Sequence, residues 1–371
     1  MRSFVPLYLS RVFRLSIFCL ALLAPSGLVR AGEPEIVETF GAADAPGRLV
    51  IRSTIDLRIF GQVVDAYLET RPDLQIVYQQ WGSNDLYQDS VEGCHGGDDP
   101  ADMVMSSGVH QMVRLVNDAC ALSYRSPATA NLPSALRWRD ELWGVTREPV
   151  VMVYNRRLVP PSEIPHTRFD LLDLLRPSLS RYAGKVATYD IEQSGVGYLF
   201  AFADSREATT FGALLESFGR TDAVATCCSA ELISGVADGT YLIAYNVIGS
   251  YAMELAYGDD RLGVVLPEDY TLVLSRAVMI PKQAHHPVEA QAFLEYLLSS
   301  AGQTELQRAR LIMPLIGEVG AEGETISETA LRSISLSPTL LVALDRQKRS
   351  HFISRWRETF EVARPPESDP Q

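Results

Sequence analysis

One pattern recurs along this chain: a short apolar run, a turn of small polar residues or glycine, and then an amphipathic segment with helical spacing. In the first copy, residues 49–51 are apolar, Ser53 and Thr54 form the turn, and apolar residues then recur at the spacing that buries one side of a helix. Strands that alternate with helices predict an α/β protein with mostly parallel sheets. A chain of 371 residues is too long for one compact core, so we expect two lobes.

The same unit can be followed through most of the chain. Further strands are expected at residues 74–78, 103–105, 150–154, 185–189, 241–245, 262–266 and 271–280. A helix is expected to begin at Pro287, and two more helices are expected within residues 327–362. Residues 32–47 are polar and rich in Ala, Gly and Pro, which predicts a flexible leader, and residues 364–371 are expected to form a polar tail.

The first 31 residues have the features of a secretory signal peptide. Arg2, Arg11 and Arg14 precede an apolar run at 15–24, and a small-x-small sequence ends at Ala31. The alternative, a membrane anchor, needs about 20 apolar residues, twice the length of this run. We therefore expect export to the periplasm, with residues 1–31 removed.

Charge and motif content exclude several classes of function. Removal of residues 1–31 leaves 29 basic against 46 acidic residues, a net charge of −17, so a basic nucleic-acid surface is not expected. The sequence has no GxSxG nucleophile motif and no phosphate-binding GxxxxGK[ST] loop, and Gly195-Val196-Gly197 lacks the rest of a dinucleotide fingerprint. An exported enzyme would need a nucleophile with a base in reach, and we find no such set. We therefore expect no catalytic residue, metal site or cofactor.

Four cysteines remain after residue 31, and an exported chain can oxidise them. Cys94 and Cys120 are candidates for a disulfide between a loop and a helix end. Cys227 and Cys228 are adjacent, and the sequence leaves open whether they form a bridge or stay free thiols.

Four strand-to-helix turns carry small hydroxyl, amide or glycine residues: Ser53-Thr54, Ser106-Ser107-Gly108, Ser194 to Gly197, and Asn246 to Ser250. The start of a helix exposes unpaired N–H groups and the positive end of its dipole, which suits an anionic or oxygen-rich ligand. Any one of these turns is more simply explained as a helix cap. Four turns at corresponding positions favour a shared binding site at the carboxyl ends of the strands.

Six segments together resemble the family 1 extracellular solute-binding proteins, in the branch that includes ferric-ion-binding and phosphosugar-binding proteins and the phosphoglycerate transport regulatory protein. The resemblance extends from about Arg48 to Trp356. Its segments are RLVIRSTID (48–56), ADMVMSSGVHQMVRLVND (101–118), WGVTREPVVMVYN (143–155), VATYDIEQSGVGYLF (186–200), AYNVIGSYA (244–252) and PEDYTLVLSR (267–276).

This resemblance implies a class II periplasmic binding fold: two lobes, each a mostly parallel sheet flanked by helices, joined by two hinge crossings near residues 147–150 and 267–273. Lobe one would combine residues 48–147 with 272–363, and lobe two would span 148–271. The implied function is capture of a small ligand for an inner-membrane ABC permease by a monomer. The alternative partner is a sensor histidine kinase, as the phosphoglycerate regulatory relative suggests.

The ligand is expected in the cleft, held by hydrogen bonds. The expected contact residues are Ser53, Thr54, Ser106, Ser107, Arg147, Thr188, Ser194, Gly195, Asn246, Ser250 and Tyr270. Ferric-binding relatives carry two adjacent tyrosines after the strand that corresponds to 241–246, whereas this chain has only Tyr251 there, so iron is disfavoured. A phosphorylated metabolite or a carboxylate is favoured instead, with counter-charges among Arg52, Arg58, Arg147, Lys185 and Arg276. For Arg147 a salt bridge with Glu148 or another acid is the competing interpretation.

Overall fold

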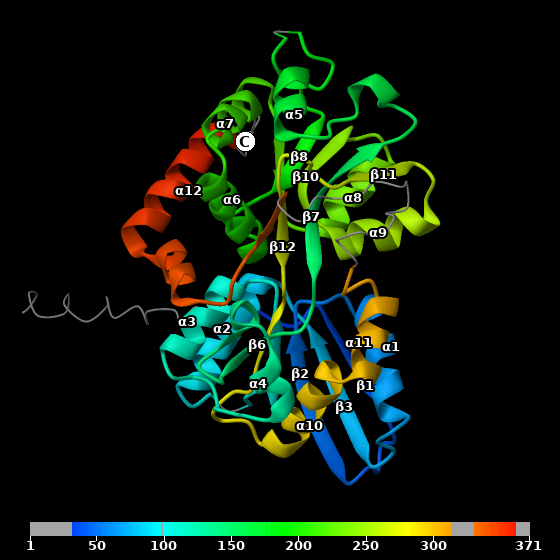
Figure 1. Cartoon of the computed structure of the whole chain (residues 1–371), viewed down its shortest axis with the longest axis vertical. Coiled ribbons are helices and arrows are strands. Elements are labelled where there is room, and N and C mark those ends of the chain that lie inside the picture. The colour runs from blue at the N-terminus through cyan, green and yellow to red at the C-terminus, as the bar shows by residue number, and fades with distance from the viewer. Residues whose placement is uncertain (1–31, 98, 178, 314–329, 361–371) are drawn as a thin grey trace, which may run out of the picture. The chain divides into compact units, whose positions relative to one another are not determined.

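The computed structural model describes residues 32–97, 99–177, 179–313 and 330–360. The expected signal peptide at 1–31 and the expected tail at 364–371 lie outside these ranges. In the described residues no helix has both the length and the apolar character needed to cross a membrane. The chain forms two mixed sheets flanked by helices, which confirms the expected α/β class (Figure 1).

The first sheet and its helices form lobe one. Its parallel centre, β3-β2-β4, is extended by antiparallel strands on both sides. In spatial order the strands are β1 (Ile36–Phe40), β3 (Leu74–Gln80), β2 (Gly47–Ser53), β4 (Met103–Ser106), β13 (Ala277–Met279), β6 (Leu142–Gly144) and β5 (Arg137–Trp138). Its helices are α1 (Leu57–Leu68), α2 (Ser83–Cys94), α3 (Val109–Asn117), α4 (Pro127–Asn131), η1 (Ser134–Leu136), α10 (Pro287–Leu298) and α11 (Ser300–Arg308).

The second sheet and its helices form lobe two. Strand β7 lies antiparallel to β10, β11 and β12, so this sheet is mixed rather than mostly parallel. The strand order is β14 (Leu331–Ser333), β12 (Thr271–Leu274), β7 (Glu148–Asn155), β10 (Ile243–Ile248), β8 (Val186–Tyr189) and β9 (Val224–Thr226), with β11 (Leu262–Val265) also on β7. Its helices are η2 (Pro161–Glu163), α5 (Arg168–Leu175), α6 (Gly195–Glu207), α7 (Phe211–Arg220), α8 (Ser229–Ala237) and α9 (Gly249–Gly258), and the C-terminal segment adds η4 (Pro338–Leu344) and α12 (Arg346–Phe360).

Two connections between the sheets lie wholly within the described residues, and a third, from α11 to β14, includes residues 314–329, which lie outside them. The first runs from β6 to β7 through residues 145–147, and the second runs from β12 to β13 through Ser275 and Arg276. β7 and β12 pair with each other at this point, with Val273 opposite Pro149 and Leu274 opposite Glu148. The two expected crossings are therefore present, and the second lies a few residues later than 267–273.

The expected flexible leader at 32–47 was wrong for its central part. Ile36–Phe40 forms β1, which pairs antiparallel with β3 over five residues. Ile36, Val37 and Thr39 are β-branched and suit a strand, and β1 supplies hydrogen-bond partners to an edge of the sheet that would otherwise be unpaired.

The expected assignment of residues 272–363 to lobe one differs from the structure at its C-terminal end. Helix α12 packs against α7, and its Ile353 and Trp356 belong to the same buried cluster as Leu214 and Phe218. Figure 1 shows α12 beside α6 and α7. The apolar side of α12 is thus buried against lobe two, whereas the sequence-based assignment places this segment in lobe one.

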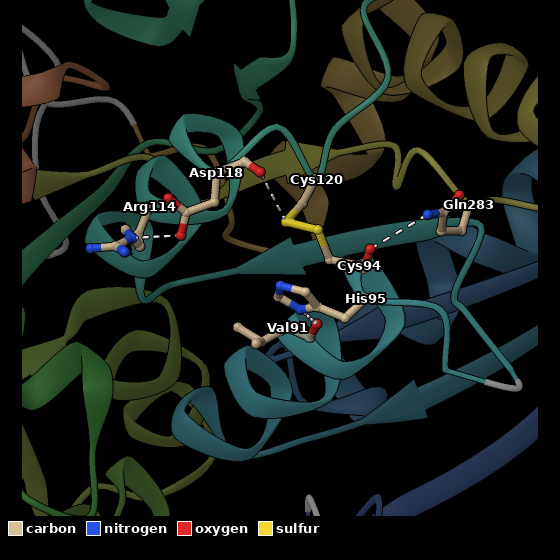
Figure 2. The surroundings of a disulfide bond; sticks show 7 residues. All are labelled: Val91, Cys94, His95, Arg114, Asp118, Cys120 and Gln283. Atoms are coloured by element: carbon tan, nitrogen blue, oxygen red, sulfur yellow. Dashed lines mark hydrogen bonds and ion pairs between the residues drawn. A yellow bond between two sulfur atoms is a disulfide. The ribbon is translucent and has the colours of Figure 1, made fainter.

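The structure contains both of the disulfides that the sequence allowed. Cys94 and Cys120 form a disulfide with Cα atoms 5.1 Å apart, which joins the last residue of α2 to the loop after α3 (Figure 2). Cys227 and Cys228 are also bonded to each other, in the turn between β9 and α8. Glu231 lies close enough to form a three-residue group with this pair, but sulfurs joined in a disulfide are not available as thiolate ligands to a metal.

Candidate functional site

The turns after β2 and β4 meet where the first sheet faces the crossings. Thr54 Oγ1 donates to Ser107 Oγ at 3.1 Å and accepts from the Ser107 N–H at 2.9 Å. Thr54 follows the carboxyl end of β2, and Ser107 follows β4, its parallel neighbour. The parallel pairing therefore brings two hydroxyl-bearing turns together, as expected for strands whose carboxyl ends share one edge.

A buried ion pair lies directly against these hydroxyls. Arg276 Nε and Glu148 Oε1 are 2.8 Å apart, and neither side chain is exposed to solvent. Glu148 also accepts from Thr146 Oγ1 at 2.7 Å and from Ser250 Oγ. Arg276 Nη1 donates to the Thr54 carbonyl oxygen at 3.1 Å. Each nitrogen of the guanidinium and each oxygen of the carboxylate therefore has a hydrogen-bond partner. Such partners are needed to offset the desolvation cost of burying two charges.

Tyr251, near the start of α9, connects lobe two to the same place. Its hydroxyl accepts from the Asp56 N–H at 3.0 Å and donates to the Thr54 carbonyl oxygen at 3.1 Å. Burial raises the pKa of the Tyr251 phenol, so the group is protonated at neutral pH. We call the residues Thr54, Ser107, Thr146, Glu148, Ser250, Tyr251 and Arg276 the hinge cluster.

A second group of polar side chains connects the two lobes, between helices α2 and α3 of lobe one and the start of α6 in lobe two. Asn84 Nδ2 donates to the carbonyl oxygens of Glu192 and Gln193, both at 2.9 Å, and Ser83 Oγ accepts from the Gly195 N–H at 2.9 Å. Gln111 Nε2 donates to Asn84 Oδ1 at 2.8 Å. These contacts place the first turn of α2, in lobe one, against the first residue of α6, in lobe two. We call Ser83, Asn84, Gln111 and Gly195 the amide cluster.

Gly195 lets the first residue of α6 approach the ends of two side chains of lobe one closely. A Cβ atom there would lie 2.8 Å from Gln111 Oε1 and 2.9 Å from Asn84 Oδ1. Ser194 caps α6 by accepting from the Gly197 N–H at 3.1 Å. The turn from Ser194 to Gly197, which the sequence analysis selected for its serine and glycines, therefore forms a close contact between the two lobes.

The structure divides the expected contact residues into groups. Thr54, Ser107 and Ser250 meet in the hinge cluster, and Ser194 and Gly195 lie at the amide cluster. Ser53 and Ser106 are buried and accept from backbone N–H groups two residues later, so they act as local turn caps.

Thr188, Asn246 and Tyr270 lie elsewhere, inside lobe two. Asn246 Nδ2 and the Tyr270 hydroxyl donate to the two carboxylate oxygens of Asp204, at 2.6 and 2.7 Å. Arg168 pairs with the same carboxylate at 3.1 Å and stacks on the Tyr270 ring. Thr188 Oγ1 donates to the Tyr245 carbonyl oxygen at 3.1 Å. The three residues thus belong to a buried network that the protein satisfies by itself.

The basic residues expected as counter-charges to the ligand do not lie together in the structure. Arg52 pairs with Asp89 and Asp99, Arg58 pairs with Asp56, and Lys185 donates to backbone carbonyls. Arg147 lies beside the first crossing, its N–H bonded to the Leu311 carbonyl oxygen, and its side chain is exposed. The alternative Arg147–Glu148 salt bridge is not formed, because Glu148 pairs with Arg276.

Sequence reasoning missed Ser83, Asn84, Gln111 and the role of Glu148. Asn84 and Gln111 lie in the first turns of α2 and α3, so a search for polar residues one turn inside each helix would have found them. No local signal pairs Glu148 with Arg276, because 128 positions separate them.

Comparison with known proteins agrees with this architecture. The family profile described as "Bacterial extracellular solute-binding protein" matches residues 58–309. The chain is similar to the substrate-binding protein of an ABC transporter from Agrobacterium tumefaciens, with 31% identity and a TM-score of 0.80 over 88% of this chain and 98% of that one. No curated protein sequence matches the chain.

Two more distant structures share the fold. Iron-bound HitA from Pseudomonas aeruginosa has 18% identity and a TM-score of 0.63, covering 85% of this chain and 99% of its own. AfuA from Actinobacillus pleuropneumoniae, determined with fructose-6-phosphate bound, has 18% identity and a TM-score of 0.65, covering 86% and 100%. At this level of identity the likeness extends to the fold alone.

Proposed function

The chain belongs to the family of bacterial extracellular solute-binding proteins, and on that premise we propose that it captures a small polar or anionic solute between its lobes for an ABC-type permease in the inner membrane. The family is one of transport rather than of enzymes. The observation that carries the proposal is the hinge cluster, where lobe one supplies Thr54 and Ser107 and lobe two supplies Ser250 and Tyr251, beside the strands that join them.

Hinge motion about the paired strands β7 and β12 would open and close the space between the lobes. A solute that contacts both lobes stabilises the closed form, because only there does it gain both sets of contacts. The direct lobe-to-lobe hydrogen bonds of Asn84, Ser83 and Tyr251 are the contacts that a bound solute would supplement or replace.

The chemistry of the surrounding groups favours an oxygen-rich solute. Helices α3, α6 and α9 all begin at these turns, and their N-terminal dipole ends favour negative charge. The charge of Arg276 is neutralised by Glu148, so Arg147 is the candidate counter-charge. We therefore favour a phosphate ester or a carboxylate. The phosphosugar bound to AfuA supports testing that class.

Ferric ion is a weaker candidate. Ferric-binding relatives carry two adjacent tyrosines, whereas this chain has only Tyr251 at that position, and its hydroxyl is hydrogen-bonded to Asp56 and Thr54. A sensing role, in which the closed form contacts a membrane histidine kinase, uses the same closure. If the liganded protein stimulates the ATPase of a reconstituted transporter, its role is transport. If it instead stimulates autophosphorylation of a membrane histidine kinase, its role is sensing.

Thermal-shift screening tests the proposal. The panel contains phosphorylated three- and six-carbon metabolites, carboxylates and ferric complexes. A solute at 100 times its dissociation constant should stabilise the fold by about 2.7 kcal/mol. Thr54→Val and Ser107→Ala should weaken that shift, while Ser234→Ala, an exposed hydroxyl on α8, should leave it unchanged. A shift with ferric complexes only would overturn the ligand class, and equal shifts in all variants would overturn the site.

A further inference from the structure

His110 is a buried titratable residue between the two lobes that the proposed function does not use. It lies in the first turn of α3, it is 1% exposed, and its Nδ1 atom has no hydrogen-bond partner in the described residues. A buried polar atom without a partner carries a desolvation cost, so its surroundings need an explanation.

The imidazole packs across the boundary between the lobes. Its ring centroid lies 5.6 Å from that of Tyr198, on α6. Helix α3 contacts β6 and β13 of the first sheet, while α6 contacts β8 and β10 of the second. The Tyr198 hydroxyl donates to the Ala343 carbonyl oxygen at 2.6 Å, which holds η4 over the same place. His110 is thus buried by parts of lobe two and by the C-terminal segment.

Among the described residues no carboxylate compensates a charge on this imidazole. The charged group that acts on it is Arg349 of α12, a cation, which also lies over the Tyr198 ring. Helix α6 presents the Tyr198 phenol, and η4, β6 and β13 contain no ionisable side chain. On α2, Tyr87 lies within electrostatic reach of the same Arg349, and on α3 itself Arg114 is paired with Asp118. Protonation would therefore place an unpaired cation next to another cation.

We infer that His110 makes closure of the lobes sensitive to protons: the closed form accepts only the neutral imidazole, so acidification favours opening and release of the solute. The inference rests on the proposed hinge closure and adds a regulatory group to it. Opening would separate α3 from α6 and give the imidazole access to water, where it can accept a proton.

The direction and size of the pH effect on the closed-to-open ratio follow from the linkage between protonation of His110 and closure. The described structure, in which His110 packs against Tyr198 of the other lobe, is taken as the closed form; there burial, with Arg349 adding to it, lowers the pKa of His110 from its ordinary value of 6.5 to about 3. More than about one pH unit above 6.5 both forms are almost entirely neutral and pH has little effect. Below pH 6.5 the open form binds a proton that the closed form does not, so the closed-to-open ratio falls about tenfold per pH unit, until pH approaches the closed-form value. Between pH 7.5 and 5.0 the fall is about thirtyfold.

Small-angle X-ray scattering at pH 7.5 and 5.0 tests this on the ligand-free chain. We expect the radius of gyration to increase at pH 5.0 in the wild type and to stay constant in His110→Phe, which keeps an aromatic ring against Tyr198 but cannot be protonated. His285→Phe, at an exposed histidine, should behave as the wild type. Circular dichroism checks that each variant is folded, and His110→Gln provides a second neutral replacement.

Two results would overturn the inference: a wild type that does not open, or a His110→Phe variant that opens equally. Titration of the imidazole by NMR gives an independent check, since an ordinary pKa in a protein that stays closed would also contradict it. The double variant Asn84→Ala/Tyr251→Phe removes lobe-to-lobe hydrogen bonds at neutral pH. If it opens while acid has no effect, the inference on His110 fails alone; if neither opens the protein, the proposed closure fails as well.

Discussion

The Arg276 guanidinium and the Glu148 carboxylate form a fully buried ion pair at the point where both crossing strands leave the second sheet. Glu148 is the first residue of β7, and Arg276 lies between β12 and β13. The pair therefore ties the two connections to each other, and through Thr54 it also ties them to lobe one. Its position makes it a structural part of the hinge as well as a neighbour of the expected solute.

Neutralising one member of this pair should be strongly destabilising. Glu148→Gln leaves the Arg276 charge buried and unpaired, and we expect a loss of about 3–5 kcal/mol in the free energy of unfolding. Urea denaturation followed by tryptophan fluorescence measures it. The double variant Glu148→Gln/Arg276→Met should lose less than Glu148→Gln alone, because it removes the unpaired charge. Equal losses would show that packing, and not charge, accounts for the effect.

The Cys94–Cys120 disulfide should stabilise the chain by restricting its unfolded state. It joins residues 26 positions apart, for which loop closure predicts a loss of roughly 3.5 kcal/mol when both cysteines are replaced by serine. The matched control is the replacement of Cys227 and Cys228, which are adjacent and close almost no loop. Urea denaturation of both double variants, with and without reductant, measures the difference. A larger loss in the control would contradict the argument.

A methyl group at position 195 should hinder closure of the lobes. Gly195→Ala introduces a Cβ 2.8 Å from Gln111 Oε1, and we expect a cost of about 1–3 kcal/mol to solute affinity or closure. Calorimetric titration with a solute from the thermal-shift screen measures it. Gly212→Ala is the control, because a Cβ at that helical position meets no atom within 4 Å. The additional change Gln111→Ala should recover part of the loss, and a failure to do so would locate the cost elsewhere.

Ferric complexes should give no tyrosinate-to-iron absorption band with this protein at neutral pH. Burial raises the pKa of Tyr251 and raises that of the neighbouring Tyr189 to about 12, which opposes the loss of a proton to a metal, and no second tyrosine is adjacent to Tyr251 in the sequence. Titration with ferric citrate, followed in the visible range, checks this, with an iron-binding fold neighbour such as HitA as the positive control. A coloured complex that disappears in Tyr251→Phe would make iron the better candidate.

Removing the Trp356 side chain should unfold or loosen lobe two. The indole is 5% exposed and packs in the cluster that contains Leu214 and Phe218, so Trp356→Ala should cost about 3–5 kcal/mol. Arg355→Ala, its exposed neighbour on α12, should change stability by less than about 0.5 kcal/mol. Hydrogen exchange locates the effect: faster exchange in α7 supports the packing described, whereas faster exchange confined to lobe one would contradict it.

The α/β class and the positions of the strand-to-helix turns can be read from local sequence patterns. Ser194 caps α6 as predicted, because such a hydrogen bond reaches only three residues along the chain. The expectation for Ser53 was wrong: Asp56 caps α1, while Ser53 and Ser106 accept from N–H groups two residues later. Which turns meet depends on the tertiary structure. It placed Thr54, Ser107 and Ser250 together, directed Asn246 and Tyr270 into the Asp204 network, and paired Glu148 with Arg276 across 128 positions. Such contacts depend on how whole sheets and helices bury their apolar faces, and local sequence patterns do not encode that arrangement.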